Sequence, residues 1–190
     1  MAVPPTPKEI LRRELVERRR AHVAALSFPE RVAATALLRG HVLPLLEGMK
    51  GRVAAYLPLG EEVDTLPLIA VLAERGVELA LPHYVSSAKP ARFLAWSPGD
   101  PLLPGPMSLR QPEPQAPEVA PAAFLTPLLA FDAKLYRLGY GAGFYDKAFA
   151  AFPEARRIGV AWDCQRIDCL PRDKWDVPLH VVATERQVYK

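Results

Sequence analysis

One segment reads as strand, helix and strand in succession, and it constrains the fold more than any other feature. An apolar run at 52–57 (RVAAYL) predicts a buried strand, 65–75 predicts a helix, and 77–81 predicts a second strand. Gly76 stands where the C-cap of that helix is expected. Two strands joined by a helix pair in parallel through a right-handed crossover. The sequence therefore predicts an α/β protein with a mostly parallel sheet.

Segments on either side extend this pattern over the whole chain. Helices are predicted at 7–26, 29–46 and 143–152, and further strands at 92–96, 123–130, 157–162 and 179–184. Pro127 inside one apolar run implies a bulge, an edge or a strand end. The Pro- and Gly-rich stretch 97–121 is interpreted as a long connection without regular structure, of a kind that is usually functional or mobile. We expect one three-layer αβα domain over residues 1–190, Rossmann-like, with five or six strands and helices on both faces.

Composition narrows the class of protein. The chain has 190 residues, of which 50% are hydrophobic and 24% charged, as expected for a single globular domain. No apolar run reaches the ~18 residues of a membrane helix, and the first residues lack the pattern of a signal peptide. Cys164 and Cys169 have neither redox nor zinc-site spacing. We therefore expect a cytoplasmic protein with no membrane partner.

The charge pattern suggests nucleic-acid binding only weakly. The formal net charge is +3, and the run Arg18–Arg20 is the densest cluster of basic residues. No recognised nucleic-acid module accompanies it, so the run is interpreted as a solvated helix face and no nucleic-acid partner is expected.

The start of the first helix carries a second basic feature. Thr6 is a candidate N-cap, with Pro7 at the first helical position and Glu9 three residues after the cap. Lys8 and Arg12 are four residues apart and share one face. The helix dipole disfavours cations at this end, so a helix start with two cations and free amide hydrogens would suit an anionic ligand.

A glycine-rich loop is the most informative motif. Gly139, Gly141 and Gly143 alternate between a predicted strand and a predicted helix. Successive amides in such a loop form a nest for an anion, and the following helix adds positive potential. The spacing matches neither the P-loop nor the dinucleotide GxGxxG motif, and a purely structural tight turn stays open.

Residues beside the loop favour a phosphate site. Arg137 precedes the loop, where its guanidinium can clamp a phosphate. Asp146 follows it and would either cap the helix or hold a metal ion beside the phosphates. Tyr140, Phe144 and Tyr145 would either stack on a planar ring or join the core.

The stretch 131–146 (FDAKLYRLGYGAGFYD) resembles the signature of the 5-formyltetrahydrofolate cyclo-ligase family, also called 5,10-methenyltetrahydrofolate synthetases. The Lys8 and Arg12 pair resembles the family's N-terminal KxxxR, and 56–58 with 62–65 resembles its first sheet loop. The resemblance implies an ATP- and Mg²⁺-dependent ligase. It would close 5-formyltetrahydrofolate to 5,10-methenyltetrahydrofolate through a phosphorylated formyl oxygen, with release of ADP and phosphate.

The resemblance also implies a role for each matched position. Lys8 and Arg137 would be catalytic, and Asp146 and Asp176 would bind Mg²⁺. The folate would contact Leu57, Glu62 and Tyr145, with Glu62 holding the pterin ring. ATP would contact Lys8, Arg12, Arg137, Leu138, Gly139, Tyr140, Gly141, Ala142, Gly143, Phe144 and Tyr145. We expect a monomer whose partners are the folate and ATP.

Several positions depart from the family's pattern. Leu135 stands where glycine is usual, so the turn before Arg137 is expected to differ, and Ala142 should be tolerated if its φ is negative. Phe144, Met107 and His83 also differ and bear on folate affinity. Two alternatives remain: an α/β enzyme that binds a nucleotide or sugar phosphate but acts on a non-folate substrate, and a relative without turnover.

Overall fold

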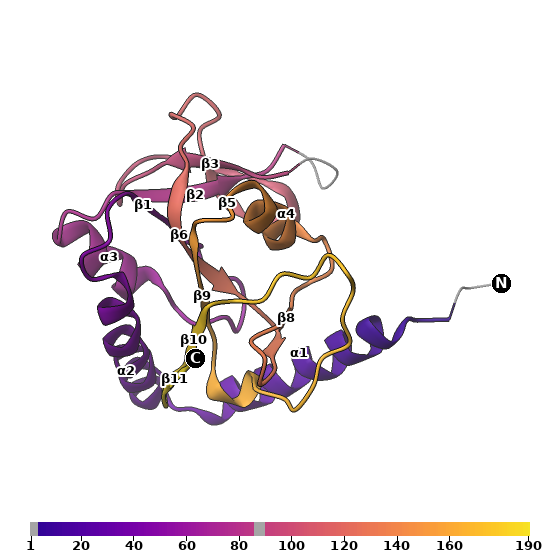
Figure 1. Cartoon of the computed structure of the whole chain (residues 1–190). Helices are drawn as coiled ribbons and strands as arrows, with labels where there is room; N and C mark the ends of the chain where they lie inside the picture. The colour runs from indigo at the N-terminus through magenta and orange to yellow at the C-terminus, as the bar shows by residue number, and fades with distance from the viewer. Residues whose placement is uncertain (1–3, 86–89) are drawn as a thin grey trace.

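The computed structural model describes residues 4–85 and 90–190 and centres on one seven-stranded sheet (Figure 1). The strand order across the sheet is β11-β10-β9-β6-β1-β2-β3. The bounds are β1 Arg52–Ala54, β2 Leu79–His83, β3 Arg92–Ala95, β6 Pro121–Pro127, β9 Arg156–Val160, β10 Val181–Ala183 and β11 Val188–Tyr189. The five inner strands pair in parallel, whereas β3 and β11 pair antiparallel at the two edges.

Helices cover both faces of this sheet, which confirms the predicted three-layer α/β class. One face packs against α2 (Phe28–Leu46) and α3 (Leu66–Glu74), through Leu38, Val42, Leu68 and Leu72. The other face packs against α4 (Phe144–Ala151), where Phe149 contacts the ring of Phe124 on β6. Among the described residues no helix is both long and apolar enough to span a membrane.

The first helix lies outside these layers. Helix α1 (Pro7–Ala25) begins at the capping box of Thr6 and Glu9 that the sequence predicts. It crosses the end of the sheet where the parallel strands finish, beneath β8 and β9 in Figure 1. Leu15 joins Ala130, Leu138 and Leu170 in a small apolar cluster that fixes this position. One face of α1 is thereby held over the carboxyl edge of the sheet, where α/β proteins bind ligands.

Several parts of the chain differ from the sequence prediction, and the strands expected at 52–57 and 123–130 are observed as β1 Arg52–Ala54 and β6 Pro121–Pro127. The stretch 97–121 is not without structure, because β4 (Leu102–Pro104) and β5 (Arg110–Pro112) form a hairpin around the 3₁₀ turn η1 (Pro106–Ser108). A second hairpin joins β7 (Ala130–Phe131) to β8 (Arg137–Leu138). The central sheet has seven strands instead of five or six, since β11 also pairs with β10. Pro127 is the last residue of β6, opposite Val160, so it marks a strand end.

Candidate active site

A cavity of about 670 Å³ lies at the carboxyl edge of the sheet. Its walls come from α1, the loops after β1 and β2, the η1 turn, the glycine loop and the segment 173–176. Every site residue expected from the sequence lines this one cavity: Lys8, Arg12, Leu57, Glu62, Arg137, Leu138, Gly139, Tyr140, Gly141, Ala142, Gly143, Phe144, Tyr145, Asp146 and Asp176. Residues as far apart in sequence as Lys8 and Asp176 are therefore gathered at one place.

The glycine loop uses two of its glycines for backbone geometry. Gly141 has φ 103 and Gly143 has φ 64, and Gly143 is the N-cap of α4. A Cβ on Gly141 would also stand 3.2 Å from the Cζ of Arg12. Arg12 donates from Nε to the carbonyl oxygen of Gly139 at 2.9 Å, which ties the loop to α1. Ala142 is not among the described residues with positive φ, as its tolerance requires.

Arg137 is almost fully buried at the base of this loop. It donates to the Val177 carbonyl at 2.8 Å and pairs with Oδ1 of Asp146 at 2.9 Å, while its Cζ lies 4.5 Å from the centre of the Phe149 ring. Burial lowers the pKa of Arg137, and the Asp146 charge opposes that shift. Asp146 sits in the first turn of α4 but makes no capping bond there. Of its two possible roles, capping is therefore not the one observed.

Lys8 forms a second charge cluster in the cavity wall. Its Nζ lies 2.7 Å from Oδ2 of Asp173 and 2.8 Å from Oδ2 of Asp176. Burial alone would lower the pKa of Lys8, but hydrogen bonds and charges from the two aspartates outweigh it and raise the pKa. Lys8 and Arg137, two of the cations expected to meet phosphate, are thus paired with Asp176 and Asp146, the carboxylates expected to meet the metal.

The donor chemistry of these carboxylates fits magnesium. Mg²⁺ is usually held by one or two carboxylates together with substrate phosphates and water, and Asp146 and Asp176 both face the cavity. Within residues 4–85 and 90–190 no group of three or more His, Cys, Asp or Glu side chains could hold a metal alone. A magnesium site here would accordingly need the phosphates of a nucleotide to complete it.

The opposite part of the cavity is apolar and aromatic around one carboxylate. Oε2 of Glu62 accepts from the Leu59 amide at 3.0 Å, and Oε1 accepts from the Tyr140 hydroxyl at 3.1 Å. Desolvation raises the pKa of Glu62, while the Leu59 amide, the Arg19 charge and the Tyr140 hydroxyl lower it. Leu57 is half-buried beside it, and burial raises the pKa of Tyr145 well above its usual value. This end could hold a planar ring with hydrogen-bond donors on its edge.

Arg19 was interpreted from the sequence as part of a solvated face, and that interpretation is wrong. It is only 3% exposed and lines the cavity, whereas Arg18 and Arg20 on either side are exposed. Arg19 lies between Leu15 and Val23 at four-residue steps, and all three are buried. That position in the apolar stripe was the signal that could have identified it.

Other cavity residues also escaped the sequence analysis. Tyr84 follows β2, and its ring lies tilted by 44° against that of Phe144 with ring centres 4.4 Å apart. Asp173 also lines the cavity and supplies the second partner of Lys8. These residues lie in loops without periodic pattern, so only the folded chain brings them to the site.

The departures from the family pattern fall at different distances from the cavity. Leu135 has φ 61, which is the left-handed conformation that glycine favours. Met107 lines the cavity, also with a positive φ of 57. His83 is buried away from it and bonds through Nδ1 to the Pro112 carbonyl at 3.0 Å.

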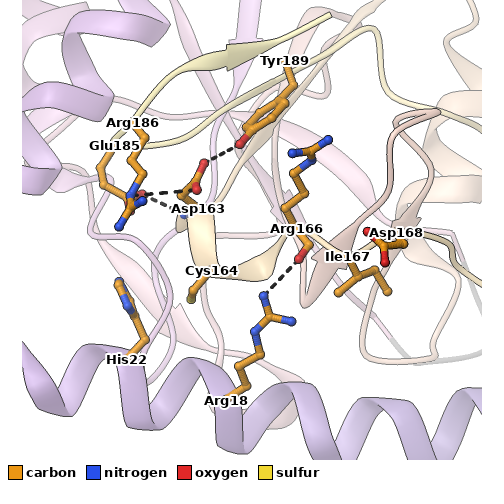
Figure 2. Close-up of a pocket in the computed structure, with 10 residues that line it drawn as sticks. All are labelled: Arg18, His22, Asp163, Cys164, Arg166, Ile167, Asp168, Glu185, Arg186 and Tyr189. Carbon is orange, nitrogen blue, oxygen red and sulfur yellow. Dashed lines mark hydrogen bonds and ion pairs between the residues drawn. The ribbon is translucent and has the colours of Figure 1, made fainter.

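A second, smaller pocket of about 350 Å³ lies between α1 and the turn η2 (Asp163–Gln165), and Figure 2 shows its lining residues. Arg18 donates there to the Arg166 carbonyl at 3.0 Å, and Asp163 accepts from the Tyr189 hydroxyl at 2.6 Å. None of the site residues expected from the sequence lines this pocket. The larger cavity is therefore the candidate active site.

The fold and this cavity define an α/β protein with a glycine-rich loop and a large cavity at the carboxyl edge of its sheet. The profile of the 5-formyltetrahydrofolate cyclo-ligase family matches residues 5–185, and the chain belongs to that family.

Named relatives agree with this assignment. The 5-formyltetrahydrofolate cyclo-ligase of Escherichia coli K12 is 34% identical over 149 residues, covering 75% of this chain and 82% of that protein. The cyclo-ligase of Mycolicibacterium smegmatis is also 34% identical, over 97% of both chains. The solved structure of Aquifex aeolicus 5,10-methenyltetrahydrofolate synthetase has a TM-score of 0.80 at 30% identity, covering 97% of this chain and 93% of that one. The resemblance seen in the sequence is thus confirmed.

Proposed function

We propose that this cavity closes 5-formyltetrahydrofolate to 5,10-methenyltetrahydrofolate, with ATP and Mg²⁺ as the other requirements. The observation that carries the proposal is the meeting of two unlike half-sites in one cavity. One half has paired cations, a glycine loop and two carboxylates, and the other has aromatic walls around Glu62. A nucleotide fits the first half and a pterin the second.

The chemistry requires the formyl oxygen to become a leaving group. That oxygen attacks the γ-phosphorus of ATP, the bond to ADP breaks, and a phosphorylated formyl group results. N10 of the folate then attacks the formyl carbon, phosphate departs with the oxygen, and N10 loses its proton. Phosphoryl transfer of this kind asks for positioning and charge stabilisation and needs no protein nucleophile.

The charge pairs of the protein suit this sequence of steps. Lys8 is held by Asp173 and Asp176, and Arg137 by Asp146, so both cations are oriented before any ligand arrives. Phosphate oxygens would compete for Lys8 and Arg137, while the loop amides and Arg12 face the same anion. Magnesium bound by Asp146 and Asp176 would neutralise charge on the phosphates.

Glu62 would hold the pterin ring at the other end. Its two oxygens retain free lone pairs beyond the bonds to Leu59 and Tyr140, and they would accept from ring N–H groups. Leu57 and Tyr145 would flank the ring, as the family resemblance implies. Location in the cytoplasm and a monomeric state stay predictions.

A direct assay tests the proposal. Purified protein is mixed with 5-formyltetrahydrofolate and MgATP, and the near-ultraviolet absorbance of methenyltetrahydrofolate is followed, with controls that lack ATP or contain EDTA. A rise that needs both ATP and magnesium supports the proposal. No rise, with ATP binding still measured by calorimetry, would favour a different substrate. No rise and no ATP binding would mean that the glycine loop serves only the fold.

A further inference from the structure

Arg19 is a buried cation that neither the fold nor the proposed chemistry has used so far. Its Nη2 donates to the Tyr140 hydroxyl at 2.7 Å, and its Cζ lies 5.8 Å from the centre of the Tyr140 ring. Nε and Nη1 are buried without a hydrogen-bond partner among the described residues. In the same part of the chain, no carboxylate lies within ion-pair distance of Arg19.

A buried arginine with unmatched donors destabilises the folded state. Removing a guanidinium from water costs several kcal/mol unless its charge and donors are matched, and apolar replacements of buried charges are often neutral or stabilising. Packing of α1 alone would favour an apolar residue between Leu15 and Val23. The position of Arg19 in the cavity wall points to a role in ligand binding instead.

The hydrogen bonds around Arg19 lead from the guanidinium through the phenol to the carboxylate. A guanidinium can only donate, so the Tyr140 oxygen accepts from Arg19, and the Tyr140 hydroxyl donates to Oε1 of Glu62 at 3.1 Å. The other oxygen of Glu62 accepts from the Leu59 amide at 3.0 Å. Both oxygens are therefore used as acceptors, as in an ionised carboxylate of fixed orientation.

We propose that Arg19 is a positioning residue for the folate, acting through the Tyr140 hydroxyl to hold Glu62 as an oriented carboxylate that receives the pterin ring. This inference rests on the proposed function, because Glu62 is assigned to the pterin there. Arg19 lies outside the family signature. Through the Tyr140 hydroxyl, it links the glycine loop to the folate end of the cavity.

The groups around Glu62 set its pKa and therefore the pH dependence of folate binding. The groups that face it are Arg19 from α1, Tyr140 from the glycine loop, Tyr56 after β1, Tyr84 after β2 and Tyr145 from α4. Desolvation raises the pKa of Glu62, and the charge of Arg19 opposes that shift. Loss of Arg19 would raise this pKa further, so the acid limb of folate use would move to higher pH.

Arg19→Met is the informative variant, because methionine keeps the length and apolar stem of the side chain. We expect its KM for 5-formyltetrahydrofolate at pH 7 to rise at least tenfold, with kcat and the KM for ATP within about threefold of wild type. The acid limb of kcat/KM for the folate should move to higher pH. Arg19→Lys keeps the charge and should restore part of that profile. Arg18→Met, on the exposed face of the same helix, is the matched control and should leave kcat, both KM values and the pH profile unchanged.

Tyr140→Phe tests the proposed path without removing a charge. It should raise the folate KM in the same direction, and the double variant Arg19→Met/Tyr140→Phe should lose less than the product of the two single effects. Multiplicative effects would show that Arg19 does not act through Tyr140. If Arg19→Met fails to fold, as judged by its thermal unfolding, Tyr140→Phe and Arg19→Lys still decide the question.

The outcomes separate this inference from the proposed function. Turnover by wild type with an unchanged folate KM and pH profile in Arg19→Met would overturn the role of Arg19 alone. A fall in kcat together with similar rises in the KM for both substrates would indicate that Arg19 is merely structural. No turnover of 5-formyltetrahydrofolate by wild type would overturn the proposed function, and the role of Arg19 with it.

Discussion

Glu62 is a carboxylate that folding removes from water. Its carboxylate lies in a cavity of mainly apolar lining, and burial raises its pKa. The Leu59 amide and the Tyr140 hydroxyl compensate in part. A carboxylate kept ionised under these conditions is a cost to the folded state, of the kind that functional residues impose.

Glu62→Gln should therefore stabilise the protein while it weakens folate binding. Because the pKa of Glu62 is raised in the folded state, its favourable contribution to stability is complete below its unfolded value near 4.5 and is lost as pH rises through the folded pKa. The Tm of Glu62→Gln relative to wild type should therefore increase between pH 4 and pH 7. The folate KM should rise at least tenfold, about 1.4 kcal/mol. Thermal unfolding across this pH range checks the first part and steady-state kinetics the second. A variant that is less stable at pH 7 would contradict this view of Glu62.

At the residue scale, sequence reasoning located charged residues that lie in motifs and missed one that lies in a periodic stripe. Lys8, Arg12 and Arg137 stand beside recognisable patterns, and the structure gathers them in one cavity. Arg19 was hidden inside a basic run whose neighbours are exposed. Its burial follows from helix phase with Leu15 and Val23, but the partner Tyr140 is 121 residues away and could not be read from α1 itself.

At the scale of elements, the glycine loop combines two demands. Gly141 needs both a positive φ of 103 and space against Arg12, while Gly139 has no atom within 4 Å of a built Cβ and no positive φ. The same residue type therefore serves different purposes two residues apart. Gly141 is required by the folded backbone, whereas neither backbone conformation nor packing requires a glycine at position 139.

Paired substitutions separate these purposes. Gly141→Ala should lower the free energy of unfolding by about 1–3 kcal/mol, because it forces an L-residue into a left-handed conformation and displaces Arg12. Gly139→Ala should leave stability within about 0.5 kcal/mol of wild type. Denaturant unfolding measures both changes, and calorimetric titration with MgATP measures affinity. If Gly139→Ala weakens ATP binding at unchanged stability, close approach of the ligand is the reason for that glycine. Equal destabilisation by the two variants would show that the loop geometry is misassigned.

Elements with a strong apolar pattern were predictable, and short paired segments were not. The predicted helix at 7–26 and the strand at 157–162 match α1 and β9 to within two residues at each end. The β4–β5 and β7–β8 hairpins have strands of two or three residues. Such strands carry no periodicity, and their pairing depends on contacts that form only in the folded chain.

At the scale of the molecule, segments near the two ends of the chain meet at the cavity. Lys8 on the first turn of α1 contacts Asp173 and Asp176, more than 160 residues later. The cavity wall is therefore complete only when both segments are in place. Because Lys8 and Arg137 already have carboxylate partners, a nucleotide would exchange partners with these two cations without having to order free side chains.

Lys8→Met tests whether this connection serves the ligand or the fold. Partly exposed ion pairs contribute about 0–1 kcal/mol, so the Tm should fall by no more than about 4 °C in a chain of this length. The value of kcat/KM for ATP should nevertheless fall at least tenfold, since a phosphate contact is lost. Arg52→Met is the matched control, because Arg52 pairs with Glu78 at 2.7 Å outside the cavity. It should show the small stability change with wild-type kinetics.

Hydrogen exchange should further show that MgATP protects residues 6–12 and 170–178 of wild type, and protects them less in Lys8→Met. A large drop in Tm with unchanged ATP kinetics would place Lys8 in the fold and remove it from the site.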